Sequence, residues 1–259
     1  MKHFNLPTLP HLENPPAVDS AGLSVVSVTK KFGRTTVLHD VSFNVGRSEV
    51  VGLLGPDGAG KTVTFYSILG LLRINGGQII LDGEDISGLP LDQRARRGLG
   101  YLPQETSIFR GLTVEQNIMT VLELFEKDPV ARAQKLDDLL AEFHIDYVRK
   151  VPARALSGGE RRRCEIARAM AANPTVMLFD EPFAGIDPMS VRDIKGMISK
   201  LERHDVGILI TDQNVREMID LLDRVYILHE GRIVFSGAPE AMLQDKTVRR
   251  LYLGEELFH

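Results

Sequence analysis

Apolar residues change their spacing several times along this chain, and each change marks a different kind of element. Residues 23–29 and 38–45 alternate or form β-branched runs, which predicts two antiparallel strands near the start. Residues 49–54 form a short apolar run typical of a buried strand. Similar patterns predict strands at 77–83, 99–103, 175–182, 207–212, 225–228 and 232–236. The last two flank Glu230-Gly231, which indicates a hairpin.

Apolar residues at helical spacing are concentrated between residues 113 and 173. Thr113 is the predicted N-cap of a helix at 114–125, and Pro129 opens a second helix that runs to residue 143. The apolar stripes of these helices are more typical of core packing than of a cofactor site. Further helices are predicted at 62–72, 90–98, 161–172, 191–203, 215–222, 239–243 and 246–252.

The strand at 49–54 and the helix at 62–72 enclose Gly55-Pro-Asp-Gly-Ala-Gly60-Lys61-Thr62, which fits G-x-x-x-x-G-K-[ST]. A helix N-terminus offers free N–H groups and a positive dipole end, so this order predicts a phosphate site. Gly58 and Gly60 allow the loop N–H groups to turn inward. We expect Lys61 to contact the β- and γ-phosphates and Thr62 to ligate Mg²⁺. A glycine-rich turn with a chance Lys-Thr is the alternative.

Polar side chains with suitable chemistry follow three other predicted strands. Asp180 and Glu181 end the strand at 175–182; Asp180 suits Mg²⁺, and Glu181 suits a base that orients attacking water. Gln104 follows the strand at 99–103, and its amide oxygen can reach Mg²⁺ or that water, or belong to an ordinary loop. Gln213 follows the strand at 207–212, which we expect beside the strand that carries Asp180.

Two other stretches allow both a functional and a structural interpretation. Leu156-Ser-Gly-Gly-Glu160 precedes a helix, so it is a second candidate phosphate site or a plain N-cap. Phe32 lies shortly before the phosphate loop, where an aromatic ring can stack on adenine, or it is a core or edge aromatic.

Composition further limits the class of protein to which this chain can belong. The 259 residues suffice for one large domain or two small ones, and 31 basic against 35 acidic residues give a net charge of −4. With no basic excess we expect no nucleic-acid partner. The single cysteine, Cys164, excludes an internal disulfide and suits a reducing cytoplasm. No signal peptide or spanning run is visible, so we expect membrane association only through other chains. Residues 1–22 contain four prolines and are expected to form a loose extension.

Taken in order, these motifs resemble those of the ATP-binding subunit of ABC transporters, from about residue 23 to residue 259. Residues 55–62 resemble the Walker A loop, Gln104 the Q-loop glutamine, and residues 156–160 the family signature. Residues 176–181 resemble Walker B with its catalytic glutamate, and residues 184–187 the D-loop. The resemblance implies an α/β fold of the ABC ATPase type. Such a fold has a P-loop NTPase core with a mixed parallel sheet, an N-terminal antiparallel β subdomain and an inserted helical subdomain at about 105–172.

The resemblance also implies the ligands and the site. ATP and Mg²⁺ are the expected cofactors, with Phe32 against adenine and with Thr62, Gln104 and Asp180 around the metal. Glu181, Gln104 and Gln213 are the implied catalytic residues. The remaining implied nucleotide contacts are Gly55, Pro56, Asp57, Gly58, Ala59, Gly60, Lys61, Val63, Ser157, Gly158, Gly159 and Asp187. Two copies are expected to sandwich two ATP molecules, each between one Walker A loop and the signature of the other copy.

Among ABC transporters, the phrases at 101–110, 156–163, 180–188, 211–217 and 252–255 resemble the ATPase of the lipopolysaccharide-export transporter of Gram-negative bacteria. That resemblance implies a subunit on the cytoplasmic face of the inner membrane whose permease partners bind near Gln104, Phe109 and Arg110. An ATPase of branched-chain amino-acid import, and a non-transport ABC protein, are the alternatives.

Three residues depart from the family pattern, and all three lie near the expected nucleotide. Asp57 replaces the usual Asn, Val63 replaces the usual Thr or Ser, and Gln213 stands where most members have a histidine. These departures bear on the rate of hydrolysis more than on ATP binding, so a weakly active nucleotide sensor is a further alternative.

Overall fold

The computed structural model describes residues 21–184, 188–212 and 215–253. Nearly all of the extension expected at 1–22 therefore lies outside the described residues, as do Asp187 and Gln213. The strands are β1 Leu23–Phe32, β2 Thr35–Val45, β3 Val50–Leu54, β4 Gly76–Leu81, β5 Glu84–Asp85, β6 Leu99–Leu102, β7 Val176–Asp180, β8 Gly207–Thr211, β9 Arg224–His229 and β10 Arg232–Gly237. The α-helices are α1 Lys61–Leu69, α2 Leu91–Arg96, α3 Val114–Phe125, α4 Pro129–Glu142, α5 Gly158–Met170, α6 Pro188–Arg203, α7 Val215–Met218, α8 Pro239–Gln244 and α9 Lys246–Val248.

A six-stranded sheet in the order β10-β9-β3-β8-β7-β6 forms the centre of the described chain. The pairs β9-β3, β3-β8, β8-β7 and β7-β6 are parallel, and β10 is added antiparallel through a hairpin at Glu230-Gly231. The predictions of this hairpin and of neighbouring β7 and β8 are confirmed. Because parallel strands point the same way, the residues that follow β3, β6, β7 and β8 meet at one edge of the sheet.

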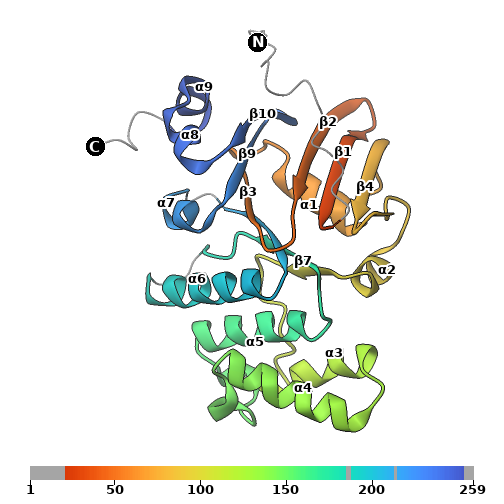
Figure 1. Cartoon of the computed structure of the whole chain (residues 1–259), viewed down its shortest axis with the longest axis vertical. Helices are drawn as coiled ribbons and strands as arrows, with labels where there is room; N and C mark the ends of the chain where they lie inside the picture. The colour runs from red at the N-terminus through yellow and green to blue at the C-terminus, as the bar shows by residue number, and fades with distance from the viewer. Residues whose placement is uncertain (1–20, 185–187, 213–214, 254–259) are drawn as a thin grey trace.

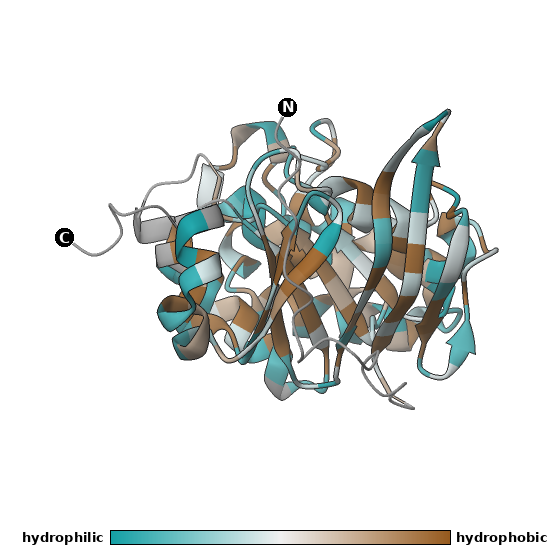
Figure 2. Ribbon diagram, turned by 90° about the horizontal axis from the view of Figure 1, so that it is seen from above, coloured by the Kyte–Doolittle hydropathy of each residue, from teal (hydrophilic) through white to brown (hydrophobic). Residues whose placement is uncertain are grey.

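A second sheet is antiparallel, in the order β2-β1-β4-β5, which confirms the predicted pairing at the start of the chain. It stands beside α1, at the side of the molecule away from α6 and α7 (Figure 1). The central sheet is covered on both faces, and the alternating side chains of its strands fill two separate cores. From β3, Val50 and Leu54 enter the core that includes α3, α5 and α6, whereas Val51 and Leu53 pack with α1 and the antiparallel sheet. Figure 2 shows these apolar strands enclosed between the layers.

The helices α3, α4 and α5 lie together at one end of the molecule, below α6 in Figure 1. Helix α3 begins where predicted, at Val114, with Thr113 and Gln116 forming a reciprocal capping box. Helix α5 begins at Gly158, three residues before the predicted start at 161, because Ser157 caps it. Helix α1 ends at Leu69 rather than at residue 72, because Gly70 adopts a left-handed conformation there.

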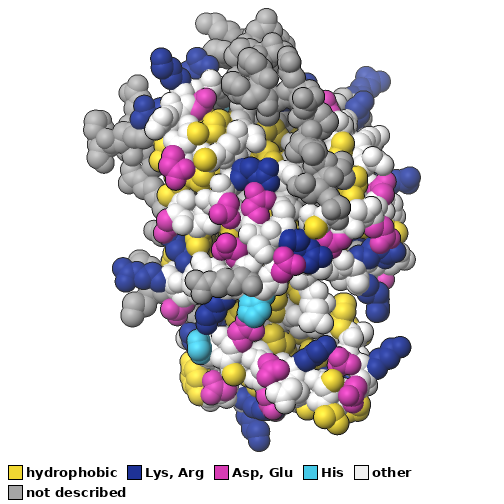
Figure 3. All heavy atoms as spheres, viewed as in Figure 1, with side chains coloured by type: hydrophobic (Ala, Val, Ile, Leu, Met, Phe, Trp, Pro, Cys, Tyr) yellow, Lys and Arg dark blue, Asp and Glu magenta, His cyan; other side chains and the backbone are white. Residues whose placement is uncertain are grey.

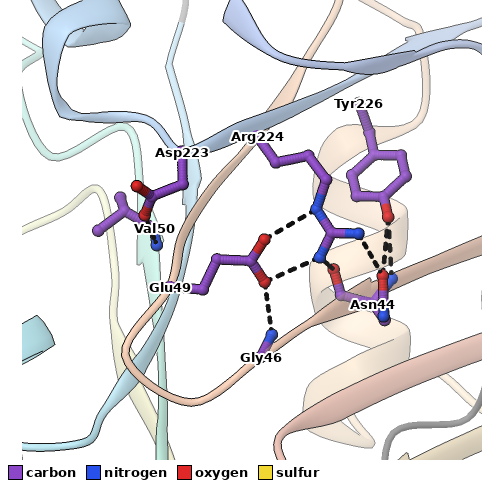
Figure 4. A network of polar contacts seen from close by, with 7 residues as sticks. All are labelled: Asn44, Gly46, Glu49, Val50, Asp223, Arg224 and Tyr226. Carbon is purple, nitrogen blue, oxygen red and sulfur yellow. Dashed lines mark hydrogen bonds and ion pairs between the residues drawn. The ribbon is translucent and has the colours of Figure 1, made fainter.

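The two sheets are tied together by polar contacts around Arg224 of β9 (Figure 4). Its guanidinium donates two hydrogen bonds of 2.8 Å to the Glu49 carboxylate and one of 2.8 Å to Oδ1 of Asn44, on β2. The Tyr226 hydroxyl donates to the same Asn44 oxygen at 2.9 Å. This forked pairing fixes the antiparallel sheet against the strand that leads into the phosphate loop.

Acidic and basic side chains are interspersed over the face seen in Figure 3. One of the two arginines of α2 is not exposed to solvent. Arg94 is buried and donates to the backbone oxygens of Ser67 and Leu89, which joins α2 to the end of α1. Among the described residues, no helix is both long and apolar enough to cross a membrane.

Candidate nucleotide site

The loop between β3 and α1 needs glycine at three positions. Gly58 and Gly60, which the motif singled out, have φ values of 77° and 110°, and Gly55 has 153°, all in the region that favours glycine. A Cβ atom on Gly55 would lie 2.1 Å from the carbonyl oxygen of Leu228, so a side chain at this position would displace the β9 backbone. Helix α1 then starts at Lys61, and the Thr64 N–H and hydroxyl both donate to the Gly60 oxygen at 2.9 Å. The loop therefore leads directly into a helix N-terminus that can bind phosphate.

The side chain of Lys61 folds back across this loop. Its Nζ donates to the carbonyl oxygens of Gly55 at 2.6 Å and Pro56 at 3.1 Å, and the residue is 7% exposed. Burial lowers the Lys61 pKa, and the negative charges of Asp57, Glu181, Asp180 and Asp212 oppose that shift, Asp57 most strongly. Asp57, which stands where the family usually has Asn, thus adds a carboxylate whose charge acts on Lys61.

Asp180, the last residue of β7, is buried and held by two hydroxyl groups. The Thr211 hydroxyl donates to Oδ1 at 2.8 Å, and the Tyr101 hydroxyl contacts Oδ2 at 3.4 Å. Both partners come from neighbouring strands, since Thr211 of β8 pairs with Asp180 and Tyr101 of β6 pairs with Leu178. Burial, the charge of Asp180 and the contact with it raise the Tyr101 pKa, so this phenol remains a neutral donor.

Glu181 follows Asp180 with φ of 44°, in the left-handed region that side chains rarely adopt. Its N–H donates to the Thr211 carbonyl oxygen at 2.8 Å, which holds this conformation against the end of β8. The Gln104 amide donates to the Glu181 carboxylate at 2.8 Å. The structure therefore brings Gln104, Asp180 and Glu181 together at the sheet edge, where the Gln104 side chain contacts Glu181 directly.

The predicted signature lies at the start of α5, and its serine does act as an N-cap. A groove of about 190 Å³ is lined by Gly158 and Arg161 on the α5 side and by Gln104 and Glu181 on the sheet side. Ser157 and Gly158 are exposed. The predicted N-cap is confirmed, and the exposure of Ser157 and Gly158 leaves the start of α5 accessible.

The two aromatic residues of interest are both exposed. Phe32 ends β1 with 47% of its surface exposed and the Lys30 ammonium 4.8 Å from the ring centre, so it is not part of the core and its ring is accessible. Phe109 is 53% exposed, and the Arg168 guanidinium lies 5.1 Å from its ring. Its backbone is nevertheless fixed, since the buried Asn117 accepts from the Phe109 N–H at 2.9 Å and donates to its oxygen at 3.1 Å.

The segment between Gln104 and Phe109 is attached to α5 by charged residues that sequence reasoning did not identify. The buried carboxylate of Glu165 accepts from the N–H groups of Ser107 and Ile108 at 2.8 and 3.2 Å. Arg162 pairs with Glu165 at 3.3 Å and donates to the Pro103 oxygen at 3.0 Å. The sequence predicted that these residues lie on one helix, but it gave no sign that they bind the backbone of the segment after β6.

The residues at this edge fit a magnesium nucleotide. A buried ammonium and a helix N-terminus suit phosphate, and Asp180 and Thr62 offer the oxygen ligands that Mg²⁺ prefers. No group of three or more His, Cys, Asp or Glu side chains in the described part of the chain could hold a metal ion by itself. Such a site suits Mg²⁺ that arrives with its phosphates and takes only one or two protein ligands. Fold and site together define a P-loop nucleotide-binding protein.

Comparison with known proteins gives the family. The family model described as ABC transporter matches residues 38–184. A probable ABC transporter ATP-binding protein of Azorhizobium caulinodans is 54% identical over 244 residues, 94% of this chain and 87% of that protein. The lipopolysaccharide export system ATP-binding protein LptB of Haemophilus influenzae is 54% identical over 236 residues, 90% of this chain and 98% of that protein.

A solved ATP-binding cassette of an ABC transporter, in its ADP conformation, matches with a TM-score of 0.81 at 24% identity. The match covers 90% of this chain and 99% of that one, and it shows the shared fold. The chain belongs to the ABC transporter family and is an ATPase of that family. The resemblance and the fold class expected from the sequence are thereby confirmed.

Proposed function

We propose that this protein is the ATP-hydrolysing subunit of a lipopolysaccharide-export transporter and works on the cytoplasmic face of the inner membrane. The observation that carries the proposal is the identity of 54% to LptB of Haemophilus influenzae over nearly the whole of both chains. LptB of Escherichia coli is 51% identical over 239 residues, 91% of this chain and 98% of that protein, which supports the same assignment.

In the proposed mechanism, Lys61 and the backbone N–H groups of residues 57–63 hold the phosphates of ATP, and Phe32 stacks on the adenine. Lys61 exchanges its contacts with the Gly55 and Pro56 oxygens for phosphate oxygens. Thr62 and Asp180 would hold Mg²⁺, which would neutralise charge on the phosphates, and the Thr211 hydroxyl keeps the Asp180 carboxylate oriented.

Glu181 orients the attacking water and accepts its proton in this proposal. Its carboxylate is positioned by the Gln104 amide at 2.8 Å and by the unusual backbone conformation at residue 181. Gln104 lies at the start of a segment attached to α5, so a displacement of that segment would withdraw the amide from Glu181. This arrangement would couple the position of the segment between Gln104 and Phe109 to the orientation of the Glu181 carboxylate.

We further propose that residues 23–259 act as one ATP-binding domain, with about 105–172 as its helical subdomain, and that two copies form the working unit. Ser157, Gly158 and Gly159 would then bind the ATP held by the other copy, together with Asp187 of the D-loop. The exposure of Ser157 and Gly158 supports this role.

The surface around Phe109 and Arg110 is the proposed contact with the integral membrane subunits. Phe109 combines a fixed backbone with a ring that is 53% exposed, which is the combination expected of an interface anchor. The apolar side chain is thus ready to bind a partner without first being ordered.

Affinity purification from detergent-solubilised membranes, with mass spectrometry of proteins and bound lipid, tests the proposal. We expect integral membrane subunits and lipopolysaccharide to co-purify. Recovery of an amino-acid import permease, of ribosomes or of DNA instead would overturn it.

A matched pair of variants tests the contact surface in the same experiment. Phe109→Ala should reduce recovery of the membrane subunits by about tenfold, because an anchor side chain contributes more than 1 kcal/mol. Its ATP affinity should be unchanged. Leu124→Ala removes another exposed apolar side chain, from α3, and should leave recovery unchanged. Equal recovery with Phe109→Ala and the unmodified protein would remove Phe109 from the interface.

A further inference from the structure

The hydroxyl group of the signature residue Ser157 makes its hydrogen bonds within its own chain. Its Oγ accepts the N–H of Glu160 at 3.3 Å and donates its only proton to Oε2 of Glu160 at 2.6 Å. The Ser157 N–H donates to the same carboxylate oxygen at 2.8 Å. A phosphate oxygen is also an acceptor, so this hydroxyl must leave Glu160 before it can donate to phosphate.

The other oxygen of that carboxylate is held by Tyr147. The Tyr147 hydroxyl donates to Oε1 of Glu160 at 2.8 Å, and its oxygen lies 3.4 Å from Nη2 of Arg163. Arginine is a donor only, so the single proton of Tyr147 points to Glu160. Arg163 also contacts Asp193 of α6 at 3.4 Å. Donors from two directions therefore fix both oxygens of Glu160.

Core packing does not explain why a tyrosine stands at position 147. Tyr147 is 65% exposed and lies in a short turn before the signature. An ordinary capping box needs only the serine and the acid. Hydrogen bonds from Ser157 and Tyr147 lower the Glu160 pKa, so the acid is charged at neutral pH. The negative charge of the Glu160 carboxylate, which is hydrogen-bonded to Ser157, also repels an approaching phosphate group, because both carry negative charge.

We infer that Tyr147 is a positioning residue for the signature: through Glu160 it holds the Ser157 hydroxyl away from ATP in the free subunit. The inference rests on the proposed function, in which Ser157 meets the ATP of a second copy. Closure of the two copies must then break the contact between Ser157 and Glu160. Weakening the hydrogen bonds that Glu160 makes with Tyr147 and Ser157 should therefore allow the two copies to close at a lower ATP concentration.

The test uses full-length protein with Glu181→Gln, which is expected to bind ATP without hydrolysing it and so to accumulate as a dimer. The ATP concentration for half-maximal dimer is measured by light scattering. Adding Tyr147→Phe should lower that concentration about threefold, because the carboxylate gains rotational freedom when one hydrogen bond is lost. Adding Glu160→Gln should lower it about fivefold or more, because a neutral amide is a weaker acceptor and carries no charge.

Two controls separate this role from a purely structural one. Glu123→Gln neutralises an exposed acid on α3 and should leave the ATP dependence unchanged. In a Glu160→Ala background, Tyr147→Phe should have no further effect, because Tyr147 acts only through Glu160. Thermal unfolding of each variant checks that the fold is intact.

An unchanged or higher ATP requirement with Tyr147→Phe would overturn the inference, as would a shift that persists in the Glu160→Ala background. If Glu181→Gln forms no dimer with ATP, the proposed dimer is wrong and the inference falls with it. A normal ATP-dependent dimer that is insensitive to Tyr147→Phe contradicts the inference alone.

Discussion

The two regions that we propose to bind ATP, the sheet edge and the start of α5, are stabilised in different ways. At the sheet edge, Lys61 and Asp180 are buried and contact backbone oxygens and hydroxyl groups that the parallel strands bring together. At the start of α5, Ser157 is exposed, and its geometry depends on the side chains of Glu160 and Tyr147. The first region is ordered by the central sheet, and the second by contacts over a few residues at the surface.

This difference indicates how each region can change during the ATP cycle. Moving Asp180 would require β7 and its neighbours to shift, because it is paired in register with β8. Moving the Ser157 hydroxyl requires only a side-chain rotation and the loss of hydrogen bonds that water can replace. We therefore expect the sheet edge to be present before ATP binds and the signature to rearrange when a second copy closes.

The largest expected effect is at the sheet edge. Glu181→Gln should lower turnover by about a hundredfold or more, because general-base catalysis contributes that much, while ATP affinity is retained. Steady-state hydrolysis and nucleotide binding measure the two properties separately. Glu105→Gln neutralises an exposed acid next to Gln104 and serves as the control. Hydrolysis by Glu181→Gln at the unmodified rate would show that the base lies elsewhere.

Thr211→Val tests whether the neighbouring strand orients Asp180. Valine has nearly the same shape but cannot donate the 2.8 Å hydrogen bond, so the carboxylate is less well oriented. We expect turnover to fall about tenfold and the Mg²⁺ concentration for half-maximal hydrolysis to rise. Thr120→Val, which removes a hydroxyl that bonds to the backbone of α3, should leave both values unchanged.

This result would also sharpen the comparison with the signature. Thr211→Val should reduce turnover, because it removes a donor to the buried Asp180, whereas Tyr147→Phe should not reduce it, because it only releases Ser157 from Glu160. If Tyr147→Phe has the greater effect on turnover, the signature is the more tightly specified of the two regions.

The smallest expected effect is at Gln213, which lies outside the described residues and follows β8. A glutamine amide can donate to the γ-phosphate as histidine does, but it does not titrate near neutral pH. We expect Gln213→Ala to lower turnover about fivefold with little change in ATP affinity, and Gln213→His to restore or raise it. Equal turnover in all three proteins would show that this position is no longer a switch.

Much of the fold followed from local patterns. Helix α3 and the hairpin of β9 and β10 were placed from apolar spacing and turn residues, because periodicity and capping act within a few residues. The phosphate loop was also predicted, because its conformation depends on glycines and a lysine that are close together in the sequence. The position of β8 beside β7 was expected from the family resemblance and from the apolar character of both strands.

Other parts of the site depended on the tertiary structure. Thr211 and Tyr101 contact Asp180 only because three strands distant in sequence align in one register, which apolar patterns do not specify. Arg94 lies in a helix whose position the local pattern predicted, but only the fold shows that its guanidinium is buried and donates to backbone oxygens of α1 and of the turn before α2. The amino-acid sequence by itself determined which residues can bind phosphate and magnesium, because their chemistry is local. The fold decided which side chains hold them in place, because that requires contacts across the molecule.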